Sequence, residues 1–392
     1  MRKSRLPAGG VNALQQVRDK RTEALAQGME LIDLSIGEPK GPALASAREA
    51  AQRAVMSDGE AMHAYQYNAS PAVPEFAERF VAAHVPRAMS GEDVAYLPIP
   101  GLKPILGLLP LSCGCATEPM RIGTMTSPGY PIPSAWCAYH PLVEHMPLPL
   151  NPGNGFRFAV TDVPADTKLL MLNYPHNPSG QVAEARWWAT LCEYCVANDI
   201  RLFNDAAYCV LSHVEESTTL SEVAPDYPEL SWCEGFTAAK LIGNGTGWHV
   251  GAMVGSPDFI ADLAVVKANT DTGFVAPMAV GALASVEQDQ SSIAEYREMY
   301  RVRLELLASI MQGQGMRLAL APNAGFFTLW ETPRFAFGEP VESAQAFNFR
   351  MIEETGVVGV HLGQYMRYAV CADVASMKDA LEAAFARASV GY

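Results

Sequence analysis

The chain has 392 residues, 49% of them hydrophobic and 18% charged, and a formal net charge of −14. This composition excludes a disordered chain, and the length favours either two domains or one large α/β unit. The negative charge argues against nucleic-acid binding, which requires clustered Lys and Arg, and no apolar run reaches membrane-spanning length.

The first part of the chain is predicted to be mainly helical. Residues 11–29 have a helical pattern that leads into a short strand at Ile32–Ile36. The Ala-rich, amphipathic segment Leu44–Met56 predicts a second helix. A third helix is expected at Pro74–Ala83, because proline is favoured near the first turn of a helix.

From about residue 94 to residue 255, apolar strand candidates alternate with helical segments. This alternation predicts a mostly parallel sheet with helices on its faces. The expected strands are Arg121–Met125, Leu169–Leu172, Ile200–Phe203, Ser231–Phe236 and Val250–Gly255, with a helix at Ala183–Asn198.

The end of the chain predicts a second, smaller structural unit. A long helix expected at Ser291–Gly313 leads into a C-terminal α+β portion. We therefore predict the α/β class, with a large domain over 46–285 and a small α+β domain built from both chain ends, 1–45 and 286–392. No internal repeat or low-complexity linker is found.

The eight cysteines do not form a disulfide scaffold in a chain of this length. Cys113 and Cys115, like Cys192 and Cys195, are closely spaced, but no second pair lies at zinc-site spacing. We therefore predict no metal site. Reduced thiols, together with a start (Met1–Arg5) that lacks the apolar core of a secretion signal, favour a cytoplasmic protein.

Three polar residues follow expected strands: Asn177, Asp205 and Lys240. In open parallel sheets, ligands bind beyond the carboxyl ends of the strands, so these side chains are expected at one edge. Singly, each has a simpler interpretation: a turn for the Asn-Pro pair, a helix cap for the Asp and a surface group for the Lys. Their combination favours a site in which an amide, a carboxylate and an amine meet.

Two motifs carry a family resemblance. Residues 173–180 read Asn-Tyr-Pro-His-Asn-Pro-Ser-Gly, and residues 205–208 read Asp-Ala-Ala-Tyr, followed later by Lys240. With these motifs the chain resembles the fold-type I pyridoxal-phosphate enzymes of the class I/II aminotransferase family, including aspartate and LL-diaminopimelate aminotransferases. The resemblance runs from Gly37 to Arg367 and implies pyridoxal 5'-phosphate as the cofactor.

The resemblance implies roles for four residues. Lys240 would hold the cofactor as a Schiff base and then move the α-proton of the substrate, which requires a lowered pKa. Asp205 would face the pyridine nitrogen and keep it protonated, so that the ring accepts electrons. Tyr208 and Asn177 would hydrogen-bond the 3-oxygen of the ring, and Asn177 would also contact the substrate.

The cofactor phosphate needs hydrogen-bond donors and positive charge. The resemblance assigns it to Gly101, Leu102 and Lys103, where Pro104 suits the first turn of a helix and backbone N–H groups attract anions. Thr237 would add a hydroxyl. An ordinary strand-to-helix turn is the alternative at Gly101, and Pro110 is expected to shorten or kink the helix there.

Two tyrosines are assigned by the same resemblance. Tyr130, in Ser-Pro-Gly-Tyr-Pro, would stack on the cofactor ring, although an isolated Pro-Gly-Tyr is also a common turn. Tyr67 would reach the phosphate bound by a neighbouring subunit, which implies a homodimer with shared active sites. Tyr65 competes for that role.

The α-carboxylate of a substrate needs a cation. Arg367 resembles the C-terminal arginine of the family, whose planar fork suits a bidentate pair, and a strand Arg with its head in solvent is the alternative. Gly37 would let its backbone approach the same carboxylate. No second cationic site for a dicarboxylate substrate can be assigned from the sequence.

The chain departs from the family pattern after the lysine. His249 stands where an arginine usually clamps the phosphate, with one apparent extra residue before it. Gly243 and Gly245 make this segment more flexible, and Ala72 stands where a glycine is expected after Tyr67. We hypothesise that His249 partly replaces the arginine.

Three functions are therefore considered. The first is an aminotransferase that moves an amino group between an L-amino acid and a 2-oxo acid. A lyase, cyclase or decarboxylase would use the same Lys, Asp and Tyr, because the cofactor does the electronic work and the pocket selects the bond. The irregular segment after Lys240 also suits a cofactor-binding protein with little turnover. An ordinary dehydrogenase is disfavoured, since no Gly-x-Gly-x-x-Gly follows an early strand.

Overall fold

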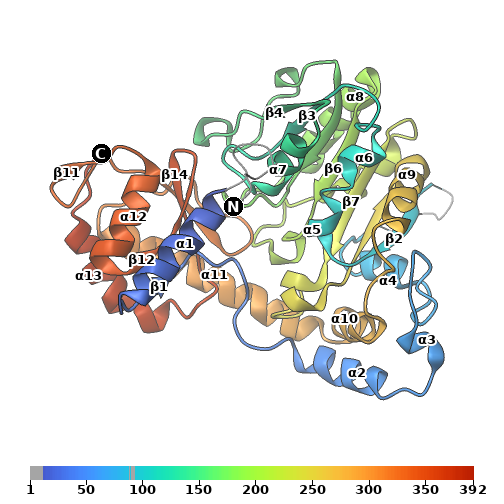
Figure 1. Cartoon of the computed structure of the whole chain (residues 1–392), viewed down its shortest axis with the longest axis horizontal. Coiled ribbons are helices and arrows are strands. Elements are labelled where there is room, and N and C mark those ends of the chain that lie inside the picture. The colour runs from blue at the N-terminus through green and yellow to red at the C-terminus, as the bar shows by residue number, and fades with distance from the viewer. Residues whose placement is uncertain (1–11, 88, 90–92) are drawn as a thin grey trace, which may run out of the picture.

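The computed structural model describes residues 12–87, 89 and 93–392 of the chain (Figure 1). The first residues, Met1–Arg5, and residue 11 of the expected first helix lie outside the described residues. None of the helices within the described ranges is long and apolar enough to cross a membrane.

A seven-stranded sheet forms the centre of the larger part. Among the described strands of this sheet, only β8 runs antiparallel to its neighbours, which confirms the predicted α/β class with a mostly parallel sheet. The strand order is β2 (Ala95–Ile99), β8 (Gly251–Gly255), β7 (Trp232–Thr237), β6 (Arg201–Asp205), β5 (Thr167–Leu172), β3 (Met120–Thr124) and β4 (Val143–Pro147).

The two edge strands, β2 and β4, were not among the expected strands. Strand β2 contains Pro98, which reads as a strand breaker and is tolerated here because β2 lies at an edge. Strand β4 is half-exposed and reads Val-Glu-His-Met-Pro, without the apolar run of a buried strand.

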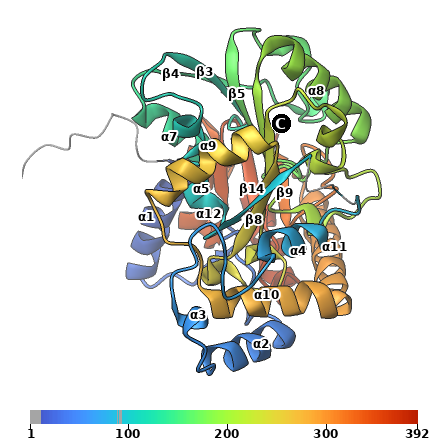
Figure 2. The ribbon, with the colours of Figure 1, turned by 90° about the vertical axis from the view of Figure 1, so that its right-hand side faces the viewer.

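Helices cover both faces of the sheet (Figure 2). Side chains alternate along β5, so that Leu169 and Met171 join one core while Leu170 and Leu172 join the other. The first face is covered by α5 (Leu102–Ile105), α6 (Leu109–Ser112), α7 (Ile132–Tyr139) and α9 (Pro257–Ala268). The second is covered by α4 (Phe76–Ala82), α8 (Ala185–Asn198) and α10 (Ala276–Gln288), and α2 (Ala45–Val55) packs on α10 beside α3 (Glu60–His63).

The N-terminal helix and the C-terminal elements of the described chain lie together at the other side of the molecule (Figure 1). The N-terminal helix α1 (Ala13–Ala26) packs on α12 (Ala344–Thr355), and β1 (Ile32–Asp33) pairs in parallel with β12 (Val357–Val358). The long helix α11 (Gln290–Gly313) leads into this part. Its other elements are β9 (Phe327–Glu331), β10 (Phe335–Ala336), β11 (Glu339–Pro340), β13 (Val360–Leu362), β14 (Tyr365–Ala369) and α13 (Lys378–Ala388). The domain boundaries after residues 45 and 285 remain a proposal.

Local differences from the sequence predictions have local causes. The strand expected at Ile32–Ile36 ends at Asp33. Leu34 N–H still donates to the Val358 carbonyl, but the Leu34 carbonyl accepts from Ala369 N–H in β14, so the chain changes its pairing partner at Leu34. Helix α4 begins at Phe76, after Glu75 in a left-handed conformation (φ 58°). As expected from Pro110, the segment after residue 101 forms two short helices, α5 and α6.

Candidate active site

A cavity of about 960 Å³ opens where the sheet faces the N-terminal helix. Of the residues predicted to form the site, all but Tyr67 line this cavity. They are Gly37, Gly101, Leu102, Lys103, Tyr130, Asn177, Asp205, Tyr208, Thr237, Lys240, His249 and Arg367.

Strand register explains why distant residues meet here. Strands β5, β6 and β7 are parallel neighbours, so the segments that follow them reach the same edge with Asn177, Asp205 and Lys240. The antiparallel strand β8 starts at that edge, where Gly251 pairs with Thr237 on one side and with Ile99 on the other.

Lys240 lies in a short 3-10 turn directly after β7, where the Thr237 hydroxyl accepts from Ala239 N–H (3.2 Å). Its Nζ donates to the Gly37 carbonyl at 3.0 Å. Burial lowers the pKa of the Lys240 amine, against the opposing effects of Cys371, Glu38 and Asp205. The amine is therefore more readily neutral than an exposed lysine, as a base or nucleophile must be.

Gly37 is required by its surroundings. A Cβ at this position would lie 2.5 Å from Cζ of Phe327, so a side chain cannot fit without displacing that ring. The glycine thereby lets the backbone at position 37 pack directly against the Phe327 ring.

Asp205 is buried at the end of β6, with 8% of its surface exposed. Its Oδ1 accepts from Ala207 N–H at 3.1 Å, and its other carboxyl oxygen has no hydrogen bond within the described part of the chain. Burial raises the pKa of Asp205 to about 6, although the Ala207 hydrogen bond and Lys240 act in the opposite direction. A cation placed against the second oxygen would stabilise the ionised acid.

Arg367 on β14 is 4% exposed, so the alternative of an arginine head in solvent is wrong. Its Nη1 donates to Asn177 Oδ1 (3.1 Å) and its Nη2 to the Ser35 carbonyl (2.9 Å). Both acceptors are neutral, and its buried Nε has no partner among the described residues. Burial lowers the pKa of Arg367 to about 10, which leaves it charged at neutral pH and in need of an anion.

Two phenols border the space between these charges. Tyr208 is buried and packs edge-on against Phe326 and Phe327, with ring centroids 5.4 and 5.9 Å away. Burial raises the pKa of both Tyr208 and Tyr130, so each hydroxyl keeps its proton and can donate a hydrogen bond.

Another part of the cavity lining combines a tight turn with polar groups. Gly101 has φ 83°, and a Cβ there would lie 3.9 Å from Cα of His249, itself in a left-handed conformation (φ 54°). Lys103 is exposed at the rim. Leu102 is different from its neighbours, because its side chain packs in the core against Gly235, leaving only its backbone for a ligand.

Tyr67 does not line its own cavity. Its side chain is 57% exposed, its backbone is left-handed (φ 49°), and its ring lies 5.7 Å from that of Tyr65, which is 63% exposed. In this conformation neither tyrosine contributes to the cavity of its own chain.

Sequence reasoning missed the wall contributed by helix α1. Leu14, Val17, Arg18 and Arg21 line the cavity at the spacing of one helical face. That spacing is visible in the sequence, but nothing in the sequence says which surface the helix covers. Arg21 is held by Asp33 (2.8 Å), whereas Arg18 forms no ion pair among the described residues. The other missed lining residues include Asn12, Gln15, Glu38, Ile132, Trp136 and Asn173.

The chain is similar to known proteins over nearly its full length. It is 28% identical to the LL-diaminopimelate aminotransferase of Desulforudis audaxviator, over 90% of this chain and 86% of the relative. Its fold matches that of an aspartate aminotransferase from Thermus thermophilus with a TM-score of 0.80, at 23% identity, over 96% of both chains. For an aspartate aminotransferase from Rhizobium meliloti the TM-score is 0.85, at 19% identity, over 99% of this chain and 98% of the other.

A family model, aminotransferase class I and II, matches residues 29–383. The match includes every residue of the predicted site. The members of this family use pyridoxal 5'-phosphate. The protein therefore belongs to the aminotransferase class I and II family and is a pyridoxal-phosphate-dependent aminotransferase.

Proposed function

We propose that the cavity performs this chemistry with Lys240, Asp205, Tyr208 and Arg367. The observation that carries the proposal is a pair of buried ionisable groups, each without an ion-pair partner in the described part of the chain. A buried acid, Asp205, and a buried arginine, Arg367, line one cavity without an ion-pair partner within the described residues. A ligand with a cationic ring nitrogen and a carboxylate supplies both missing partners.

The residues present fit the cofactor. Pyridoxal phosphate carries an aldehyde and a ring nitrogen on one heterocycle. The Lys240 amine, which would bind the aldehyde, and the unpaired Asp205 oxygen, which would face the ring nitrogen, line the same cavity. The same cavity lining offers a phosphate an open turn, a cation, a hydroxyl and an imidazole, from Gly101, Lys103, Thr237 and His249. When bound, the cofactor supplies a ring that accepts the electrons left by a broken Cα–H bond.

Each residue then has a defined task. Lys240 would hold the cofactor through its amine and, as a base, would take up the α-proton of the substrate. Asp205 keeps the ring nitrogen charged, and Tyr208 and Asn177 donate hydrogen bonds toward the ring oxygen, while Tyr130 covers a ring face. Arg367 orients the α-carboxylate, with Gly37 beside it.

A spectroscopic half-reaction screen tests the proposed function. The visible absorbance of the cofactor should fall when an amino acid is added and return when a 2-oxo acid is added. Ammonia release or a cyclic product without a 2-oxo acid would instead indicate lyase or cyclase chemistry, and no spectral response to any amino acid would indicate a binding protein.

His249 is proposed to share the phosphate with Lys103 and Thr237. An imidazole can donate a hydrogen bond to a phosphate, so its removal should weaken cofactor binding. His249→Ala should therefore lower the affinity for the cofactor, and His249→Arg, which restores the arginine usual in the family, should keep it. Equilibrium dialysis against pyridoxal phosphate measures both. Unchanged affinity of His249→Ala at every pH tested would contradict the hypothesis.

We also propose that the amino donor carries a second anionic group. The support is Arg18, an exposed arginine of α1 that lines the cavity without an ion pair in the described ranges. Aspartate and LL-diaminopimelate, named for similar proteins, both carry a second carboxylate.

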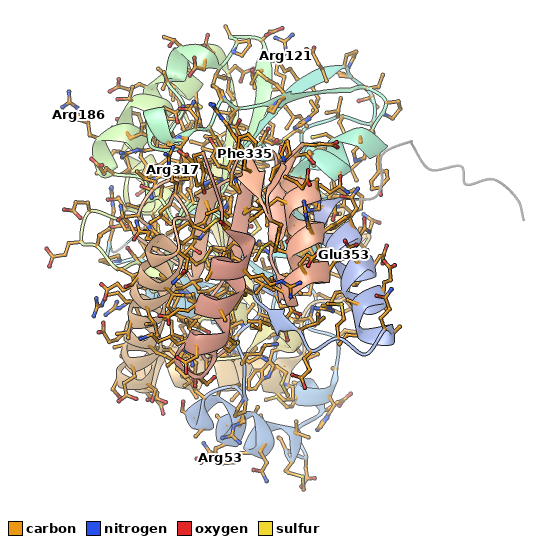
Figure 3. The ribbon with its side chains drawn as sticks, turned by 90° about the vertical axis from the view of Figure 1, so that its left-hand side faces the viewer. Arg53, Arg121, Arg186, Arg317, Phe335 and Glu353 are labelled. Atoms are coloured by element: carbon orange, nitrogen blue, oxygen red, sulfur yellow. The ribbon has the colours of Figure 1, made fainter. Side chains whose placement is uncertain are left out.

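Replacing Arg18 with glutamine should lower kcat/KM for acidic donors about tenfold, the effect of one hydrogen bond to a charged group. Neutral donors should change little. Arg186→Gln is the matched control, since Arg186 is an exposed arginine on α8, on the side opposite to α1 in Figure 3. Equal losses for acidic and neutral donors would contradict this assignment.

The protein is further proposed to act as a cytoplasmic homodimer in which Tyr67 reaches the phosphate of the partner's site. The support for the dimer is the outward position of Tyr67 and its absence from the lining of its own cavity. The eight free cysteines agree with a reducing compartment. Sedimentation equilibrium tests the dimer, and a monomer with full turnover would contradict it.

A further inference from the structure

We propose that Lys267 is a positioning residue that holds Tyr67 for use by a second copy of the chain. The inference rests on the proposed dimer. Lys267 lies in α9, and its side chain is 0% exposed. A fully buried ammonium costs free energy unless it is closely paired, and no step proposed for the cavity uses it.

Lys267 joins two segments that are distant in sequence. Its Nζ donates to Asn68 Oδ1 at 3.0 Å and to Asp271 Oδ1 at 2.8 Å. The same Asp271 oxygen accepts from Gly273 N–H (2.8 Å). The ammonium is thus the link between the residue next to Tyr67 and the loop that follows α9.

The backbone of that loop holds Tyr67 directly. The Thr272 carbonyl accepts from the N–H groups of Gln66 (3.1 Å) and Tyr67 (2.8 Å). Gly273 has φ 96°, and a Cβ there would lie 2.7 Å from the Tyr67 nitrogen. The two backbones are therefore packed as closely as a glycine permits.

The other side of the Tyr67 segment is fixed by amides. The side chain of Gln66 is buried, donates to the carbonyls of Ala61 and Ala64 (both 2.8 Å) and accepts from Ala72 N–H (3.1 Å). Asn68 Nδ2 donates to the Ala264 carbonyl at 3.1 Å. The backbone around Tyr67 is therefore held from both sides, while its exposed ring does not line the cavity of its own chain.

A double-mutant cycle tests the assignment. Tyr67→Phe and Lys267→Met should each weaken pyridoxal-phosphate binding by about tenfold, the effect of one hydrogen bond to a charged group. The double variant should bind no more weakly than either single variant, because both changes remove the same contact. Lys168→Met, which removes an exposed lysine paired only with exposed Asp199, should bind normally. Additive losses would mean that Lys267 acts apart from Tyr67 and would overturn the proposal.

Hybrid dimers provide the second readout. In a dimer of one Lys240→Ala chain and one Lys267→Met chain, one site combines an intact Lys240 with a correctly held Tyr67 from the other chain. This hybrid should recover wild-type affinity at that site, which a merely structural defect in the Lys267→Met chain would not allow. Failure of recovery would overturn the proposal.

The remaining outcomes are also distinguishable. If Lys267→Met does not fold, Asn68→Ala replaces it in the double-mutant cycle and in the hybrid dimer. This variant removes the side-chain oxygen next to Tyr67 that accepts from Lys267, so the same results are expected. A failure of this inference leaves the half-reaction with amino acids intact, whereas a failure of the proposed function abolishes that response in the wild-type protein.

Discussion

Replacing Lys240 with alanine is expected to lower kcat by at least about a thousandfold, because one side chain provides both the covalent attachment and the proton transfer. Its amine is directed by the Gly37 carbonyl at 3.0 Å, and no other lysine except Lys103 lines the cavity among the described residues. Turnover assays at saturating cofactor measure the loss.

The control is Lys168→Ala, which removes an exposed lysine of β5 and should keep normal turnover. Circular dichroism and gel filtration should show that the Lys240→Ala chain is folded. A Lys240→Ala protein with normal turnover would disprove the assigned role.

Replacing Asp205 with asparagine is expected to lower kcat by about a hundredfold or more, since a neutral amide cannot hold a ring nitrogen in its charged form. The amide retains the size of the side chain and can still accept from Ala207 N–H. Asp205→Glu keeps the charge and serves as the conservative comparison, expected to retain more activity. Equal activity of the Asn variant and the wild type would contradict the role of the carboxylate.

The same substitution has a predicted effect on stability. The pKa of Asp205 is raised by burial to about 6, above its unfolded value of 3.8, so the folded cofactor-free protein binds the extra proton between these values. The free energy of unfolding therefore falls as pH rises from about 4 to about 6, by roughly 2 kcal/mol from this group. In Asp205→Asn this component should disappear.

Urea unfolding of both cofactor-free proteins from pH 4 to pH 8 measures the difference. Identical pH profiles would mean that Asp205 is not desolvated. With cofactor bound, the difference between the profiles should shrink, because the cationic ring nitrogen compensates the carboxylate.

Sequence reasoning identified the residues whose positions depend on strand order alone. Asn177, Asp205 and Lys240 follow buried strands of a parallel sheet, so their convergence follows from the fold class. Arg367 was assigned by resemblance, and its burial, which makes it a strong anion site, depends on packing against Phe327.

Other features depend on tertiary contacts that no local pattern encodes. Helix α1 has a recognisable face, but its packing on α12 and β13 brings Arg18 to the cavity. The core position of Leu102 follows from the absence of a side chain on Gly235, in a different strand. Lys267 looks like an ordinary helical lysine in the sequence, and its burial becomes visible only when Asn68 is placed beside it.

The identity of the lysine that binds the cofactor is the most direct test of the mechanism. The resting protein, saturated with pyridoxal phosphate, is reduced with borohydride, digested and mapped by mass spectrometry. Reduction leaves a phosphopyridoxyl group on the lysine that holds the cofactor, and this group is expected on the peptide that contains Lys240. Adding an amino acid before reduction should prevent this modification of Lys240. A label on Lys103 with Lys240 unmodified would contradict the assignment from which every other role here follows.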